Sequence, residues 1–303
     1  MSAALEQPAK HDPFDEIVKF EEHHRSLWDR SFRWLMLAGL SVGVIALAVL
    51  LIFIFAEGWR RLTPVLWQNM PSIRFPQTAG AQSAILGSIW VITMTAVITL
   101  PIGVMAAIYL EEYGNPKSRF FRIVEINIQN LAAVPSIVYG ILGLGIIARA
   151  LALGQTVITA ALTLSLLVLP IVIISTREAL RAVPQSIRAG SMALGATKWQ
   201  TIWKQVLPAA IPGVATGSIL ALSRAMGEAA PLLLLGAVTF ITFNPSGLGS
   251  SYTVMPIQIY NWISQSRSEF HTLAAALCVL LLVILLIMNG LAVYLRNRYQ
   301  KRW

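Results

Sequence analysis

Five stretches of this chain carry no charged residue over a length sufficient to cross a lipid bilayer. They are residues 34–56, 75–110, 126–148, 150–176 and 270–295. A membrane-spanning helix needs about 20 predominantly apolar residues, because the hydrocarbon layer is about 30 Å thick. A single soluble core cannot bury so much apolar surface without leaving large exposed patches. The sequence therefore predicts an all-α membrane protein that crosses the bilayer several times.

The composition supports this class and excludes others. The chain is 56% hydrophobic and 12% charged, and the charged share is about half that of a soluble domain. The net charge of +9 does not indicate nucleic-acid binding, because the basic residues lie where membrane topology predicts them. The single cysteine, Cys278, excludes an intramolecular disulfide and a cysteine-rich metal site. No small-residue cleavage site follows the first apolar run, so we expect the first helix to remain as an anchor.

Six transmembrane helices are predicted within residues 34–303, and residues 1–33 form a polar tail. In this tail, residues 14–34 fit an amphipathic helix on the membrane surface and a loosely ordered segment equally well. A polar, basic loop over 177–208 separates the fourth span from the fifth. The spans are expected at about 34–56, 84–110, 128–148, 156–176, 209–240 and 271–295.

The distribution of basic residues predicts the orientation. With six spans, both termini and the loops at 111–127 and 177–207 lie on one side of the membrane, and this side carries 17 of the 23 Lys and Arg residues. Cytoplasmic loops are enriched in Lys and Arg. We therefore expect a multi-pass protein of the cytoplasmic (inner) membrane with both termini in the cytoplasm.

The loop at 177–208 is long for a compact membrane protein, and such a loop usually has a task. Its pattern predicts a helix that is broken at Gly195, resumes at Thr197 and closes at Leu207-Pro208. This helix could dock into a groove of a soluble partner, with Trp199, Ile202 and Trp203 as its anchors. An amphipathic helix resting on lipid explains the same periodicity equally well.

The loop resembles the EAA loop of ABC-importer permeases. That motif has a Glu-Ala-Ala triplet, three further residues, a glycine and, further on, Ile-x-Leu-Pro. Here Ala189-Gly190-Ser191 occupies the triplet, so the usual glutamate is absent, and Gln205 stands at the isoleucine position. The resemblance assigns coupling to an ATPase to Ala189, Gly190, Ser191, Gly195, Ala196, Thr197, Trp199, Leu207 and Pro208.

A larger part of the chain, from about residue 84 onward, resembles phosphate-specific ABC permeases. The similarity is carried by the segments at 101–113, 130–143, 183–188 and 223–233, in the same order as in that family. The run Gly-Glu-Ala-Ala-Pro-Leu-Leu at 227–233 is similar to the A-type subunit, PstA.

The resemblance implies a type I ABC-importer architecture in which this chain is a permease for inorganic phosphate. It would pair with a C-type permease, two copies of an ATP-binding subunit and a periplasmic or lipid-anchored phosphate-binding protein, within membrane lipid. ATP and Mg would be used by the ATPase, and this chain would need no cofactor or metal of its own. The sequence has no Gly-x-x-x-x-Gly-Lys-Ser/Thr or His-Glu-x-x-His motif. We therefore expect no catalytic residue and no enzyme activity.

Two charged residues lie within the predicted fifth span. Arg224 and Glu228 are four residues apart, so they share a helix face and can pair. Ionisable residues inside a span usually face the bundle interior or a water-filled path, and an arginine there would attract phosphate. A buried ion pair that locks the fifth helix without touching substrate is an equally good explanation on physical grounds, while the family resemblance favours translocation. Pro135 and Ser136 open the third span and are candidates for lining the same pathway.

Two other functions fit parts of the sequence. One is a permease of the same type for another oxyanion, such as molybdate or sulfate, because charge alone attracts all of them. The other is a secondary transporter driven by an ion gradient, which predicts an internal repeat and several intramembrane acids. The spans hold one acid, Glu228, and show no convincing repeat.

Overall fold

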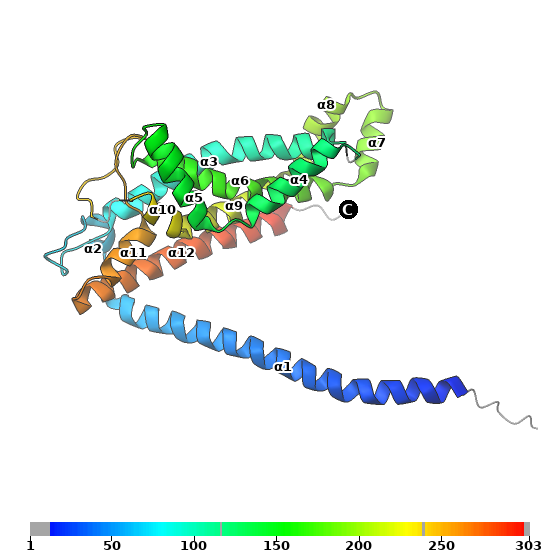
Figure 1. The fold of residues 1–303 in the computed structure, drawn as a ribbon, viewed down its shortest axis with the longest axis horizontal. Helices are drawn as coiled ribbons and strands as arrows, with labels where there is room; N and C mark the ends of the chain where they lie inside the picture. Colours follow the sequence, from blue (N-terminus) through cyan, green and yellow to red (C-terminus); the bar gives the residue numbers. More distant parts are fainter. Residues whose placement is uncertain (1–12, 116, 238–239, 300–303) are drawn as a thin grey trace, which may run out of the picture. The chain divides into compact units, whose positions relative to one another are not determined.

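The computed structural model describes residues 13–115, 117–237 and 240–299, with side chains from Trp28 onward (Figure 1). All regular structure in these ranges is helical. The chain divides into two units, the first ending at Phe53 and the second beginning at Ile54. The expected all-α class is therefore confirmed.

The helix α1 (Pro13–Gly58) contains the first span. It is continuous through the boundary expected between the tail and the span at residues 33 and 34, so the region 14–34 is helical. A 3-10 turn, η1 (Trp59–Arg61), follows it. In the second unit, the end of α1 approaches α12 (Ser268–Tyr299) closely, because a Cβ on Gly58 would lie 2.7 Å from the backbone of Ala275. Residues 1–12 of the expected tail lie outside the described residues.

Six spans are confirmed if a bent pair of helices is counted as one span. Five helices are long and apolar enough to cross a membrane by themselves, and two further helices pass the same test together although they meet at 101°. The five are Trp28–Arg61, Gln82–Tyr113, Val157–Arg181, Lys198–Gly227 and Ser268–Tyr299, and the bent pair is Arg119–Ala132 with Ser136–Ala150.

The expected third span at 128–148 is wrong in its form. The structure has α4 (Arg119–Ala132), then a bend, then α5 (Ser136–Leu142), which continues as the π-helical η3 (Gly143–Ala150). Pro135 explains the bend, because proline donates no helical hydrogen bond and disfavours helical geometry in the residue before it.

The expected fifth span at 209–240 is also wrong at both ends. The helix α9 (Leu207–Gly227) continues a helical stretch that begins at Lys198, and it stops before a separate short helix, α10 (Ala230–Leu234). Pro231 has no N–H group to donate to the carbonyl of Gly227, so the helical pattern cannot pass through this point.

The helix α6 (Val157–Arg181) is the centre of the bundle. Two thirds of its apolar window (67%) is buried, against 33% for α3 (Gln82–Ile108). It packs on α3 on one side and on α9 on the other, and α9 also packs on α12. A Cβ on Gly213 would lie 2.7 Å from the Cβ of Ala179, so small residues permit the close approach of α9 to α6.

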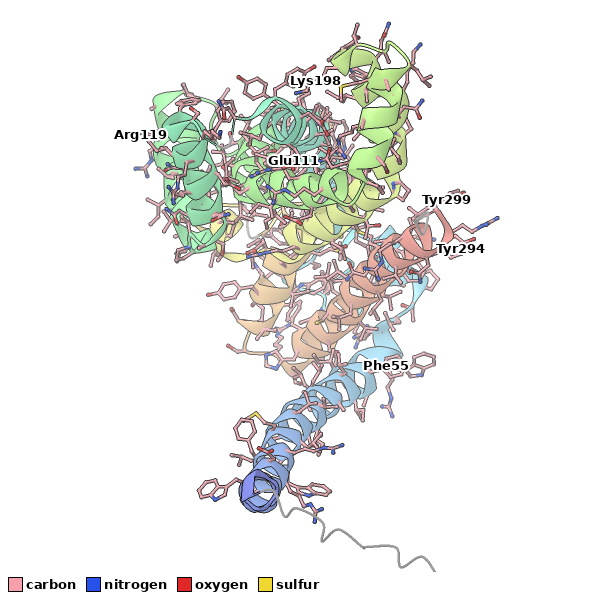
Figure 2. All side chains as sticks on the ribbon, turned by 90° about the vertical axis from the view of Figure 1, so that its right-hand side faces the viewer. Phe55, Glu111, Arg119, Lys198, Tyr294 and Tyr299 are labelled. Carbon is pink, nitrogen blue, oxygen red and sulfur yellow. The ribbon has the colours of Figure 1, made fainter. Side chains whose placement is uncertain are left out.

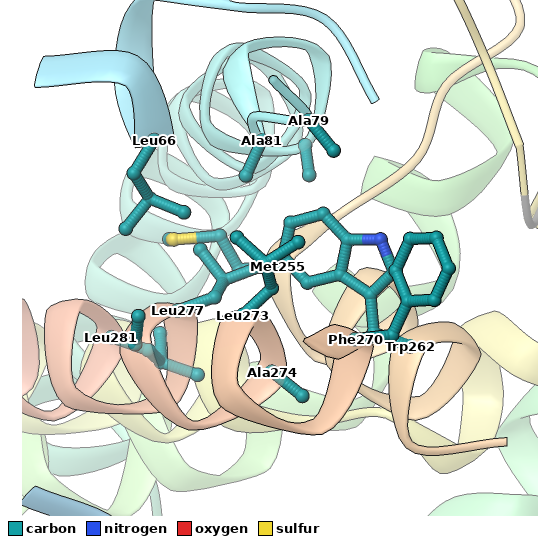
Figure 3. Packing of buried hydrophobic residues seen from close by; sticks show 12 residues of the cluster. Leu66, Ala79, Ala81, Met255, Trp262, Phe270, Leu273, Ala274, Leu277 and Leu281 are labelled. Carbon is teal, nitrogen blue, oxygen red and sulfur yellow. The ribbon is translucent and has the colours of Figure 1, made fainter. Parts of the chain in front are cut away.

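A hydrophobic cluster joins α2 (Pro64–Gln68), α11 (Met255–Ile263) and the first turns of α12, and Figure 3 shows its side chains. Its largest side chains are Trp262 and Phe270, and both are almost completely buried. In Figure 1, α2 and α11 lie at the end of the second unit away from α7 (Gln185–Ala193) and α8 (Lys198–Thr201), which form the other end. The candidate coupling segment therefore lies at the end of the bundle opposite to this cluster.

Candidate functional site

The segment at 177–208 is largely helical. The helix α6 extends to Arg181, α7 follows, and α8 leads through the π-helical η4 (Ile202–Val206) into α9 without a break. The expected break and restart of the helix are present. Gly195 has a φ of +85°, which lies in the left-handed region that glycine tolerates.

A capping box begins the new helix at Thr197. The backbone N–H of Gln200 donates to Thr197 Oγ1 at 3.2 Å, and the backbone N–H of Thr197 donates to Gln200 Oε1 at 2.9 Å. These reciprocal bonds satisfy two backbone donors that a helix start leaves unpaired. Thr197 and Gly195 therefore define the corner of the predicted coupling segment.

The expected closure of this helix at Leu207-Pro208 is wrong. The helical stretch continues through Pro208 as far as Gly227, and the π turn η4 lies directly before the proline. A π turn locally changes the hydrogen-bond pattern and fits the missing N–H of Pro208. The part of the coupling segment from Lys198 onward is thus continuous with the helix of the fifth span, which ends at Gly227.

Two of the three expected anchors are available to a partner. Trp199 and Trp203 are about half exposed, and their rings meet at 5.3 Å between centroids. The third, Ile202, is only 1% exposed and packs inside the protein, so its prediction as an anchor is wrong. The two tryptophans form an exposed aromatic pair on the outer side of α8 and η4.

A groove of about 400 Å³ lies beside α7 and α8. Figure 2 shows Glu111 and Lys198, two of its lining residues, near each other at this end of the molecule. Glu111 belongs to the π-helical η2 (Tyr109–Tyr113), which follows α3. The structure thus brings the 111–127 and 177–208 segments together. Among the residues assigned to coupling, Ala189 lines the groove, where the EAA motif has its glutamate.

Ion pairs join the walls of this groove. Arg188 Nη2 lies 2.7 Å from Glu112 Oε1, and both side chains are about nine-tenths buried. Arg181 Nε lies 2.9 Å from Glu111 Oε1, and Arg177 Nε lies 3.2 Å from Glu111 Oε2. These contacts fasten the end of α3 to α6 and α7.

These acids and arginines are not among the site residues that the sequence predicts. The partners are separated by between 66 and 76 positions in the chain, so spacing alone could not pair them. Two signals were present: the segments 101–113 and 183–188 both belong to the family resemblance, and the predicted topology puts both loops on one side.

Arg224 and Glu228 do meet, as their spacing predicts. Arg224 Nε lies 3.6 Å from Glu228 Oε1, although Glu228 stands just beyond the end of α9. The Arg224 side chain is 57% exposed and that of Glu228 is 17% exposed. Within this chain, therefore, Arg224 is not part of a buried lock, and its guanidinium faces outward.

Pro135 and Ser136 lie at the bend between α4 and α5, where Pro135 is exposed and Ser136 is half-buried. The helix α5, which follows the bend at Pro135, packs on α10, which follows the end of α9. Gly140 on α5 lies directly against Pro231 on α10. Among the described residues, no hydrogen bond joins Ser136 to Arg224. The same residues contain no group of three or more His, Cys, Asp and Glu side chains placed to hold a metal.

Comparison with known proteins identifies the family. Residues 99–301 match the family model described as "Binding-protein-dependent transport system inner membrane component". The "Phosphate transport system permease protein PstA 1" of Mycobacterium tuberculosis is 31% identical over 285 residues, covering 93% of this chain and 91% of the relative. The "Phosphate transport system permease protein PstA" of Haemophilus influenzae is 30% identical, covering 90% of this chain and 96% of the relative.

Solved structures show the same fold. A bacterial alginate ABC transporter, crystallised with its alginate-bound periplasmic protein, has a chain that superposes with a TM-score of 0.58 at 14% identity, covering 91% of this chain and 99% of that one. The MetNI methionine ABC transporter gives a TM-score of 0.54 at 17% identity, covering 71% and 95%. The fold is therefore that of ABC-importer permeases. With the family model covering two thirds of its length, this chain belongs to the inner-membrane components of binding-protein-dependent transport systems, as a multi-pass permease subunit.

Proposed function

We propose that this chain is the A-type permease subunit of an ATP-driven importer and translocates inorganic phosphate across the cytoplasmic membrane. The observation that carries the choice of phosphate is the 31% identity to a phosphate permease over 93% of the chain. The outward-facing guanidinium of Arg224 supports it, because phosphate carries one to two negative charges at neutral pH and suits the arginine fork.

The family works with ATP-binding subunits and a substrate-binding protein. Beyond this, we propose that the chain pairs with one C-type permease, two copies of the ATPase and a periplasmic or lipid-anchored phosphate-binding protein. Both termini would be cytoplasmic, as the concentration of Lys and Arg on one side suggests. The chain would be a transport subunit without enzyme activity or a cofactor of its own, and ATP and Mg would be used by the ATPase.

The coupling segment at 189–208 would receive the movement of the ATPase. ATP binding would draw the coupling segments of the two permeases together, with Trp199 among the contacts to the ATPase. Since the helical stretch Lys198–Gly227 is continuous, a displacement of α8 would be carried along α9 to Arg224 and Glu228. This is alternating access by rigid elements.

Arg224 would line the path at the face that the chain presents to its permease partner. Its contact with Glu228 is long for a charge-assisted hydrogen bond. An incoming phosphate could therefore take over the guanidinium donors at small cost. Pro135 and Ser136, at the bend of the third span, would contribute to the same path.

Uptake by reconstituted vesicles tests this function. Vesicles containing all partners and internal ATP should accumulate labelled phosphate, and excess molybdate or sulfate should compete weakly. Strong competition by either anion would reassign the substrate to that oxyanion. Vesicles with the permease pair but no ATPase should take up nothing, and uptake driven by an ion gradient alone would contradict an ATP-driven importer.

A further inference from the structure

Arg188 joins three elements at the groove. Its Nε and Nη2 donate to the carboxylate of Glu112 at 3.2 and 2.7 Å, which ties α7 to η2 at the end of α3. Its Nη1 donates to the carbonyl of Val183 at 2.6 Å, and Nη2 also donates to that of Leu180 at 2.9 Å. These two carbonyls lie in and just after the last turn of α6, where helix carbonyls lack partners.

The contact depends on the shape of arginine. Five hydrogen bonds leave one planar guanidinium in fixed directions, three toward the carboxylate of Glu112 and two toward backbone carbonyls. A lysine ammonium is a single point of charge and cannot reproduce this fork. The pair is also shielded, since the side chains of Arg188 and Glu112 are 10% and 8% exposed. Because the pair is buried, separating the two side chains would leave each charge poorly solvated. The contact therefore resists separation.

The position of the contact matters for coupling. Arg188 stands one residue before Ala189, in α7, and α7 lines the groove together with α8. The chain itself links α7 to α9 only through the corner at Gly195 and Thr197. The helix α3 has no covalent link to α7 nearby, so among these residues the Glu112 contact is a direct mechanical link between them.

We propose that Arg188 is a positioning residue that transmits the displacement of α7 to α3 and α6 through Glu112 and the end of α6. This rests on the proposed function, in which α7 and α8 receive the ATPase. With the pair intact, α3 and α6 move together with α7. When the pair is broken, α7 moves alone, and the ATPase cycle is no longer fully converted into opening of the path.

The test compares the assembled wild-type importer with Glu112→Gln and Arg188→Lys in the same vesicles. Each variant should still bind the ATPase and hydrolyse ATP, while phosphate imported per ATP hydrolysed falls by about tenfold or more. The matched control is Glu178→Gln, because the Glu178–Arg181 pair is exposed and lies within α6 alone. The control should keep the wild-type ratio.

A second measurement does not depend on the substrate. Hydrogen exchange at residues 109–113 should change when ATP is added to the wild-type complex, and this change should be lost in both variants. An unchanged ratio of phosphate to ATP, or an unchanged exchange response, would overturn the role of Arg188. If Glu112→Gln fails to assemble while Arg188→Lys assembles and imports as much phosphate per ATP as the wild type, the pair has only a structural role. Absence of phosphate uptake by the wild-type complex, with a normal exchange response, would instead contradict the proposed substrate.

Discussion

Two Arg–Glu pairs in this molecule have the same chemistry and opposite surroundings. Arg188 and Glu112 are nearly buried and meet at 2.7 Å, and the arginine is held by two further carbonyls. Arg224 and Glu228 meet at 3.6 Å, and more than half of the Arg224 side chain is exposed. The first pair joins elements that are far apart in the chain. The second lies at the end of a single helix.

The difference shows what each guanidinium can still do. The donors of Arg188 are directed at partners inside the protein. Arg188 can therefore join α7 to its neighbours, but most of its donors are not available to a ligand. Arg224 has one long contact among the described residues, so most of its donors remain open to a ligand. The pair beside α7 is thus suited to transmitting force, and the pair on the fifth span is suited to meeting an anion.

Breaking the buried pair should have the largest effect on stability. Glu112→Ala leaves the Arg188 cation buried without its carboxylate, which should lower the free energy of unfolding by about 3–5 kcal/mol. Thermal unfolding of the detergent-solubilised protein measures this. A loss below about 1 kcal/mol would mean that Arg188 finds water or another acid, and the contrast between the two pairs would be lost.

An ion pair at the same end with one more exposed partner should have an intermediate effect on stability. Arg177 Nη2 lies 3.1 Å from Glu125 Oε1 on α4, and Glu125 is considerably more exposed than Glu112. Glu125→Gln should therefore cost at most about 1 kcal/mol, because exposed ion pairs contribute little. The same unfolding measurement applies, with hydrogen exchange in α4 as the local readout. A cost equal to that of Glu112→Ala would show that burial does not control these pairs.

The smallest effect on stability is expected at the exposed pair. Arg224→Gln should change the free energy of unfolding of the isolated chain by less than about 0.5 kcal/mol, because its contact is a long, solvent-accessible i,i+4 pair. Unfolding curves of the variant and the wild type should nearly overlap. A large destabilisation would restore the alternative in which Arg224 locks the fifth helix.

The sequence predicts much of the fold for a simple physical reason. Uncharged runs of about 20 residues have few alternatives to crossing a bilayer, so the number of spans follows from hydropathy and charge. The breaks within the third and fifth spans were not predicted, because hydropathy does not detect breaks in the backbone. Pro135 and Pro231 lie inside apolar runs, and their effect on the hydrogen-bond ladder appears only in three dimensions.

The candidate site was predicted in part. The corner at Gly195 and Thr197 has local signals, a glycine and a capping residue, and both predictions are confirmed. Ile202 was wrongly expected to be an anchor, because periodicity cannot tell which apolar face of a helix the rest of the protein covers. The pairing of Glu112 with Arg188 depends on the packing of α3, α6 and α7, and the local sequence around either residue does not predict it.

Phosphate uptake by vesicles reconstituted with all partners and Arg224→Gln tests most directly whether Arg224 meets the substrate. The matched control is Arg149→Gln, which removes an exposed cation at the end of η3. Uptake should fall by about tenfold or more for Arg224→Gln, because a charged hydrogen bond to the substrate is lost, while assembly, ATPase docking and the control remain normal. Unchanged uptake by Arg224→Gln would contradict a role of Arg224 in the pathway and leave this residue as no more than a neighbour of Glu228.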